Sequence, residues 1–125
     1  MKKTVFTEKA PKPIGPYSQA VQAGNFLFVS GQLAIDPKTG SIIAKTVKLQ
    51  TRQVMENIKA ILETSGYNLS EVIQCNVYLS SMASFEKFND EYANFFGKEF
   101  PARATVGIEL KPGALIEISV VAYKE

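Results

Sequence analysis

The chain has 125 residues, of which 46% are hydrophobic and 21% are charged, and this size and balance predict one globular domain over residues 1–125. No apolar run approaches the roughly 18 residues of a membrane span, and the 14 basic and 12 acidic residues form no basic cluster, so we expect binding neither to membranes nor to nucleic acid. The absence of histidine excludes Ser-His-Asp and Cys-His nucleophile systems, histidine-containing zinc sites and imidazole acid-base catalysis.

The N-terminal segment at residues 7–18 contains three prolines and a glycine. Proline lacks the backbone N–H that helices and central strands need, so we predict an extended, stiff loop here. Two large apolar side chains, Ile14 and Tyr17, are expected to pin this loop against the body of the protein. No apolar stretch typical of a secretory signal precedes the loop, and we therefore expect a cytoplasmic protein.

A hairpin and a second turn follow the loop. Residues 19–23 and 26–33 flank Gly24-Asn25, which is a signal for a two-residue hairpin turn. Residues 36–40 place a proline and a glycine where a further turn needs them. A short strand at residues 41–44 is then expected to return along the chain.

The next two elements are an amphipathic helix and a largely buried strand. From residue 47 to about residue 64 the apolar side chains recur every three or four positions, and Gly66 is a typical C-terminal stop. Residues 72–79 alternate as a strand does and contain Cys75, the one cysteine of the chain. A lone cysteine forms no intrachain disulfide, which fits a reducing compartment, and we interpret Cys75 as a small buried hydrophobe.

A second helix and two further strands complete the chain. Ser84 can cap a helix that Gly97 ends, and the aromatic side chains of this helix form a stripe of the kind normally found in a core: Phe85, Phe88, Tyr92, Phe95 and Phe96. Strands at residues 102–109 and 114–123 flank Lys111-Pro112-Gly113, a strong turn signal, and we predict that they pair as a hairpin.

This order of elements predicts an α+β fold with both amphipathic helices on one face of a mixed sheet. One phase of the final two strands is apolar and is expected to face the helices: Ala102, Ala104, Val106, Ile108, Ile116, Ile118, Val120 and Ala122. The other phase, which holds Arg103, Thr105 and Glu117, is too apolar for a solvated face and too polar for a sealed core. We infer that this second face packs against other copies of the chain and leaves wet pockets between them.

Arg103 and Glu117 are the strongest candidates for chemistry. Hairpin pairing would bring them into one neighbourhood on the second face. An arginine offers a rigid bidentate fork for a carboxylate, and a glutamate in a partly desolvated site can relay protons. A structural ion pair at an interface explains the same two residues equally well.

Two weaker signals lie near the N-terminus. Ser30-Gly31 closes an apolar strand, where a glycine permits close approach of a ligand, although a simple β-bulge is the commoner reason for it. The Tyr17 phenol can position a water molecule, although a loop tyrosine more often packs on a sheet. There is no glycine-rich nucleotide-binding motif.

Five short motifs occur along nearly the whole chain in a familiar order and spacing. They are Pro13-Ile14-Gly15-Pro16-Tyr17-Ser18-Gln19-Ala20, Phe28-Val29-Ser30-Gly31-Gln32, Phe88-Asn89 with Tyr92, Pro101-Ala102-Arg103-Ala104, and Ile116-Glu117-Ile118. In these motifs the sequence resembles the RidA/YjgF family of reactive-intermediate deaminases. The resemblance implies a chorismate-mutase-like α+β fold, a homotrimer with clefts between subunits, and hydrolysis of 2-aminoacrylate and related enamines and imines to 2-keto acids and ammonia. It implies neither a cofactor nor a metal ion.

The resemblance also implies a role for individual residues. Three residues would be catalytic: Arg103 would bind the substrate carboxylate, Glu117 would position or activate the hydrolytic water, and Tyr17 would line the cleft beside them. Ser30, Gly31 and Asn89 would be further pocket-lining positions, and these three residues and Thr105 would bind the substrate. Many family members have cysteine where this chain has Thr105, which excludes a thiol-dependent role, and the connection between Arg103 and Glu117 is about one residue shorter than in familiar members.

Two other functions compete with deamination. The same cleft can belong to a non-catalytic or regulatory trimer that binds a 2-keto acid or another small carboxylate. A ribonuclease or translation-inhibitor activity has been attached to relatives, and the unclustered charge of this chain gives it no electrostatic support.

Overall fold

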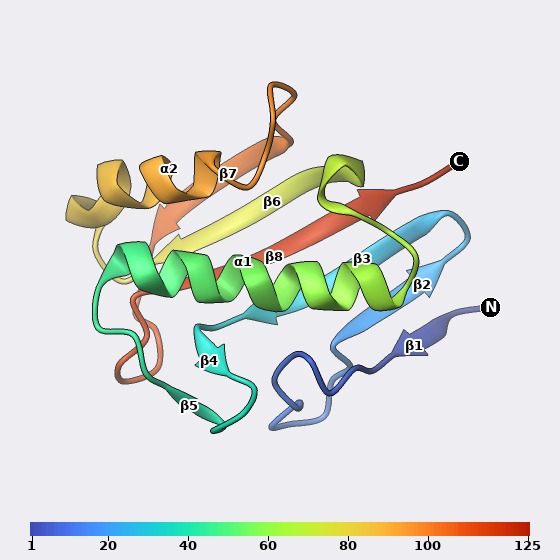
Figure 1. Ribbon diagram of the computed structural model, residues 1–125, viewed down its shortest axis with the longest axis horizontal. Helices are drawn as coiled ribbons and strands as arrows, with labels where there is room; N and C mark the ends of the chain where they lie inside the picture. Colours follow the sequence, from blue (N-terminus) through green and yellow to red (C-terminus); the bar gives the residue numbers. More distant parts are fainter.

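The computed structural model describes residues 1–125, which form eight strands and two α-helices (Figure 1). In chain order the elements are β1 (Lys3–Val5), β2 (Ala20–Ala23), β3 (Phe26–Gln32), β4 (Ile35–Asp36), β5 (Ser41–Ile42), α1 (Val47–Thr64), β6 (Val72–Leu79), α2 (Phe85–Ala93), β7 (Ala102–Gly107) and β8 (Ile116–Tyr123). Short 3-10 turns precede β6 and α2 at Leu69–Glu71 and Met82–Ser84. The edge strand β1 is an element that the sequence analysis did not predict.

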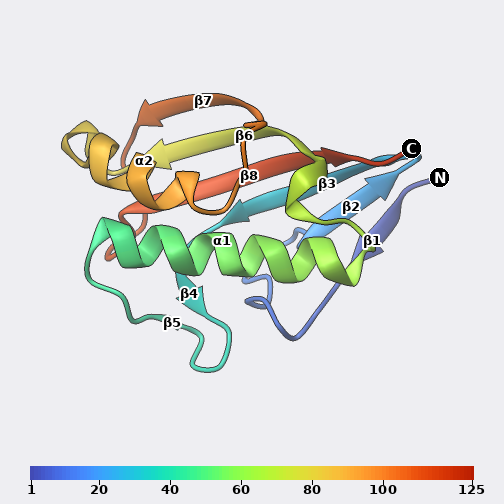
Figure 2. The same cartoon turned by 45° about the horizontal axis from the view of Figure 1, so that its top comes forward.

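Six strands form one sheet in the order β1-β2-β3-β8-β6-β7, and both helices pack on the same face of it (Figures 1 and 2). The predicted α+β arrangement is therefore confirmed. The hairpin between β2 and β3 is also confirmed, with Ala23 paired to Phe26 and Gly24 at a φ of +58° in the turn. β4 and β5 pair separately as a small two-stranded sheet around the predicted turn at residues 36–40.

The predicted hairpin between the last two strands is wrong. β6 lies between β7 and β8, antiparallel to β8 and parallel to β7. A parallel pair needs a crossover connection, and α2 supplies it between β6 and β7. The turn at Pro112-Gly113 does form, with the Ala114 N–H donating to the Lys111 carbonyl over 2.9 Å, but it belongs to a longer connection that crosses β6.

The predicted face of β7 is wrong for the same reason. Arg103 is paired with Cys75 and Thr105 with Val77, and both partners belong to the core under the helices. Arg103 and Thr105 therefore lie on the helix-covered side of the sheet, and the alternate residues lie on the opposite side: Ala102, Ala104 and Val106. In β8 the predicted phase is confirmed, because Ile116, Ile118, Val120 and Ala122 are all buried.

Helix α1 matches the predicted range because its ends are specified locally. The Thr46 hydroxyl accepts a hydrogen bond from the Leu49 N–H at the N-terminus, and Gly66, at a φ of +81°, lets the chain turn away at the C-terminus. The helix buries one apolar stripe against the sheet: Val54, Met55, Ile58, Ile61 and Leu62. Neither helix combines the length and hydropathy that a membrane span requires.

Helix α2 is shorter than predicted. It ends at Ala93 rather than near Gly97, and Ser84 makes no side-chain cap, a role that Ser81 takes at the preceding turn. The aromatic stripe is nonetheless continuous, because the rings of Phe88, Tyr92 and Phe96 are buried and lie in successive contact.

The proline-rich loop is pinned to the body, but not by the residues that we predicted. Ile14 and Tyr17 are 65% and 47% exposed, whereas the Gln19 side chain is 1% exposed. The Gln19 amide accepts from the Thr7 N–H over 2.7 Å and donates to the carbonyls of Thr7 and Pro11 over 3.0 and 2.9 Å. This one side chain thus supplies hydrogen-bond partners for backbone N–H and C=O groups of a loop that pairs with no strand.

Candidate functional site

A β-bulge in β3 brings Gly31 against Glu117. The pairing of β3 with β8 shifts between Val29 and Gln32, so that β3 carries one extra residue there. A Cβ atom added to Gly31 would lie 2.9 Å from the Glu117 carboxyl carbon, closer than real Cβ contacts allow. Glycine is therefore required at this position for the Glu117 side chain to lie across β3.

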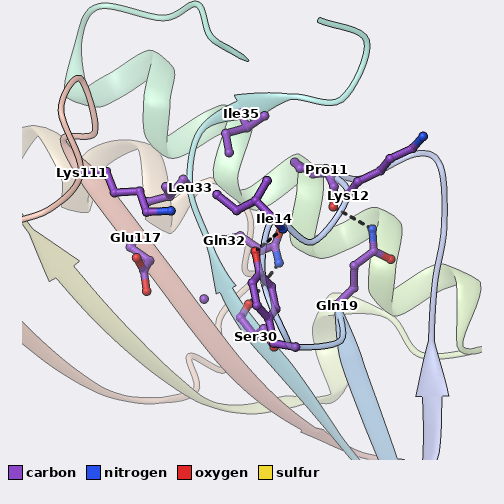
Figure 3. Close-up of a pocket in the computed structure, with 12 residues that line it drawn as sticks. Pro11, Lys12, Ile14, Gln19, Ser30, Gln32, Leu33, Ile35, Lys111 and Glu117 are labelled. Carbon is purple, nitrogen blue, oxygen red and sulfur yellow. Dashed lines mark hydrogen bonds between the residues drawn. The ribbon is translucent and has the colours of Figure 1, made fainter. Parts of the chain in front are cut away.

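The Glu117 carboxylate lines a cavity of about 290 Å³ beside this bulge (Figure 3). Tyr17, Ser30 and Gly31 line the same cavity, together with Lys111 from the connection before β8 and with other residues of the proline-rich loop and of the chain around the end of β3. Figure 3 shows Glu117 on one side of this space, with Ile14 and Ser30 across it. We call this group, consisting of Tyr17, Ser30, Gly31 and Glu117, the carboxylate half-site.

Local hydrogen bonds hold the wall of the carboxylate half-site. The Ser30 hydroxyl donates to the Ser18 carbonyl over 2.6 Å, and the Tyr17 hydroxyl accepts from the Ile14 N–H over 3.3 Å. The Ser30 proton is thus used within the chain, and its lone pairs remain for a ligand. Glu117 itself takes part in no hydrogen bond or ion pair of the chain, so its carboxylate is free to act on a bound molecule.

Gly31→Ala is expected to lower kcat about 10- to 100-fold in the reaction proposed below, because the new methyl group displaces the Glu117 carboxylate from a positioned geometry. Gly97→Ala is the matched control, since a Cβ at Gly97 meets no atom within 4 Å. Steady-state kinetics of the two variants make the comparison. Equal turnover by Gly31→Ala and Gly97→Ala would show that the close approach of Glu117 to Gly31 does not affect catalysis.

Arg103 is held in a second cavity, on the helix side of the sheet. One of its terminal nitrogens donates to the Asn89 Oδ1 over 2.8 Å. The guanidinium carbon lies 5.6, 5.3 and 5.0 Å from the ring centroids of Phe85, Phe88 and Tyr92. These distances are within the range of cation–π attraction. Arg103 and Asn89 line a cavity of about 480 Å³, and we call them the arginine half-site.

The positive charge of Arg103 has no acidic partner in the chain. The other arginine, Arg52, is paired with Glu91, its Nε lying 3.0 Å from the Oε2 of that carboxylate. Arg103 makes no salt bridge, and its one side-chain hydrogen bond is to the neutral Asn89 amide. An oriented guanidinium without a counter-ion is suited to bind a carboxylate from outside the chain.

The two half-sites do not meet within one chain. Along β6, Arg103 lies at the level of Cys75 and Glu117 at the level of Tyr78, with β6 between their strands. That register separates them by about 10 Å along the strands and about 10 Å across them. They also lie on opposite faces of the sheet. The structure thus brings the predicted site residues together as two groups, not as the single hairpin constellation that we predicted.

Thr105 and Cys75 lie on the same face of the sheet as Arg103. The Thr105 hydroxyl is buried and has no hydrogen-bond partner in the chain, and its role in substrate binding stays a prediction. Burial raises the pKa of Cys75 to about 11, which keeps the thiol neutral and agrees with its interpretation as a buried hydrophobe. No group of three or more Cys, Asp or Glu side chains is arranged to hold a metal ion.

Sequence reasoning missed two contributors to the site. Gln19 is assigned no role of its own from the sequence, although its amide holds the loop that carries Tyr17. The aromatic stripe of α2 was interpreted only as core, although two of its buried rings, Phe88 and Tyr92, also support Arg103. Recognising the strand-helix-strand crossover at residues 72–107 would have placed Arg103 on the same side as that stripe.

Comparisons with known proteins show which family and which fold this chain shares. The family model described as endoribonuclease L-PSP matches residues 7–124. The chain is 59% identical to a RutC family protein of Pyrococcus horikoshii over all of both chains. It is 38% identical to a 2-iminobutanoate/2-iminopropanoate deaminase of Dermatophagoides farinae, covering 99% of this chain and 98% of that protein. A crystal structure of a putative endoribonuclease from Thermotoga maritima superimposes with a TM-score of 0.96 at 48% identity, covering 100% of this chain and 99% of that one.

Proposed function

The chain belongs to the YjgF/RidA family, and from this premise we propose that it hydrolyses 2-aminoacrylate, 2-iminopropionate and related enamines and imines to 2-keto acids and ammonia. The observation that carries the proposal is the Arg103 guanidinium, which is oriented by Asn89 and has no acidic partner. A small substrate carboxylate would complete that fork. The name of the deaminase from Dermatophagoides farinae supports the same reaction class.

We further propose that the active site is shared between copies of the chain in a homotrimer. The arginine half-site of one subunit would face the carboxylate half-site of its neighbour, because no single chain can join the two. The helix-free face of the sheet supports this assembly. It exposes Phe26, Phe28, Val106 and Tyr123 by 36–48%, and the Phe26 ring lies 4.9 Å from that of Tyr123. Such apolar clustering is typical of a surface that another protein covers.

The exposed area of the single chain also favours assembly. Its accessible surface is 7315 Å², whereas a compact monomer of 13.7 kDa has about 6,600 Å². The excess is consistent with a chain that buries part of its surface against neighbours.

The proposed reaction needs only the groups that the two half-sites supply. An enamine first tautomerises to the imine: its methylene carbon takes a proton from water and its nitrogen gives one back. Glu117 then accepts a proton from water as the water oxygen bonds to C2, and this proton passes to the imine nitrogen to give a carbinolamine. The hydroxyl proton of the carbinolamine passes to the amino nitrogen, with Glu117 as the relay, as the C–N bond breaks, which releases ammonia and leaves the 2-keto acid. Proton transfer by a positioned side chain typically contributes about 10²- to 10⁴-fold to a rate.

In this scheme Arg103 fixes the substrate by its carboxylate, so that C2 lies next to the water beside Glu117. Fixing the reacting atoms is worth at least as much as the proton relay in well-oriented reactions. The neighbouring Tyr17 and Ser30 would border the substrate. No step requires a metal ion or a cofactor.

A stopped assay tests the proposal directly. An amino-acid oxidase generates the imines of several amino acids, and release of the 2-keto acid is followed with and without the protein. We expect acceleration that saturates with substrate. A calorimetric titration with a 2-keto acid accompanies it, because binding without turnover would contradict the deaminase proposal and support a carboxylate-binding trimer instead.

A further inference from the structure

The aromatic stripe of α2 forms a rigid and neutral floor under the Arg103 guanidinium. Of the three rings near the guanidinium carbon, that of Tyr92 is the closest, at 5.0 Å. Tyr92 is 3% exposed, so that it is a fixed part of the interior. Phe88 and Tyr92 are four residues apart on the same helix, which places their rings one above the other on the face that meets β7.

Tyr92 is itself held between two other rings. Its centroid lies 5.2 Å from that of Phe88 and 5.0 Å from that of Phe96, in tilted arrangements that aromatic pairs favour. Phe96 contacts Tyr92 without being one of the rings within reach of the guanidinium. Within the stripe, Tyr92 therefore contacts Arg103, whereas Phe96 packs against Tyr92 and does not contact Arg103.

The floor carries no negative charge that would compete with a substrate. Burial, reinforced by the neighbouring Cys75, raises the pKa of the Tyr92 phenol, and burial likewise raises the pKa of Cys75 to about 11. Both groups are therefore neutral at physiological pH. The Tyr92 hydroxyl is buried beside the Cys75 thiol and the Arg103 guanidinium, although it makes no hydrogen bond of ordinary geometry to either. The ring contacts Arg103 as well, with its centroid 5.0 Å from the guanidinium carbon.

Resting on the deaminase function proposed above, we propose that Tyr92 is a positioning residue for Arg103, whose ring, together with the Asn89 amide, holds the guanidinium fork in the direction in which it receives the substrate carboxylate. Loss of the ring would leave the arginine charged but mobile. Substrate binding would weaken, while the proton relay at Glu117, in the other half-site, would continue unchanged once the substrate is bound.

The test compares Tyr92→Leu, Tyr92→Phe and Phe96→Leu. We expect Tyr92→Leu to raise KM about tenfold with kcat within about twofold of the wild type, in line with the loss of one cation–π contact. Tyr92→Phe keeps the ring and should return KM to near the wild-type value. Phe96→Leu should lower the melting temperature as Tyr92→Leu does, because it removes a ring from the same stack, but leave KM unchanged.

An unchanged KM in Tyr92→Leu, or an equal rise of KM in Tyr92→Leu and Phe96→Leu, would overturn the positioning role. Calorimetric Kd values for a 2-keto acid are measured on the same four proteins, because binding needs Arg103 but no turnover. If the wild type binds the 2-keto acid but does not turn over imines, the deaminase function is contradicted. The Kd values of the variants then replace KM in testing the role of Tyr92. A wild type that neither binds nor turns over would contradict both.

Discussion

Arg103→Ala is expected to lower kcat/KM for 2-iminopropionate about 10²- to 10³-fold. In the proposed assembly the neighbouring subunit and the substrate would desolvate the pair of Arg103 and the substrate carboxylate, and truncating one partner of such a hydrogen-bonded charge pair costs roughly 2–5 kcal/mol. The guanidinium is the one oriented cation of the arginine half-site that has no acidic partner. No neighbouring group of the half-site can replace it, since Asn89 is neutral and the floor is aromatic. The measurement is 2-keto acid release from freshly generated imine.

Arg103→Lys separates the charge from the geometry. The ammonium keeps the positive charge but loses the planar fork, so we expect it to recover only a small part of the lost activity. Arg52→Lys is the matched control, because Arg52 is committed to Glu91 and lies in neither half-site. Turnover by Arg103→Ala at the wild-type level would show that the carboxylate is bound elsewhere.

Glu117→Gln is expected to lower kcat about 10²- to 10⁴-fold with a smaller change in KM, because it removes the group that accepts the proton from water. Glutamine has nearly the shape of glutamate and fits in the space that Gly31 leaves open. The loss would therefore reflect proton transfer rather than packing. Single-turnover kinetics measure the chemical step, and a loss confined to KM would instead make Glu117 a binding residue.

Sequence reasoning predicted the local elements well because their signals are local. The range of α1 follows from its apolar period and from the cap and stop at its ends, and the hairpin of β2 and β3 follows from Gly24-Asn25. The failure concerned which strands pair. β7 is an edge strand of small and mixed residues, and its partner is set by a crossover through α2, which no short motif encodes.

The wrong pairing of the last two strands also gave a wrong arrangement of the site. The turn signal at Pro112-Gly113 suggested that Arg103 and Glu117 are neighbours on one face, and in the structure they lie on opposite faces with β6 between them. The residue types were still informative, since Glu117 and the unpaired Arg103 each line a cavity, as the proposed chemistry requires. The aromatic stripe alone does not predict the support of Arg103, because a stripe at helical spacing is equally typical of a core. The crossover through α2 is what places Arg103 beside it.

The proposed site requires two copies of the chain for catalysis, and mixing two inactive variants tests this requirement most directly. Arg103→Ala and Glu117→Gln subunits are mixed in equal amounts and allowed to exchange. A cleft is intact when the Glu117→Gln subunit supplies Arg103 and the Arg103→Ala subunit supplies Glu117. Random assembly into closed rings makes about a quarter of the clefts intact, so about a quarter of the wild-type activity should return. Subunit exchange is verified by native mass spectrometry of differently tagged variants. Mixed assemblies that form and yet stay as inactive as the separate variants would contradict the shared site.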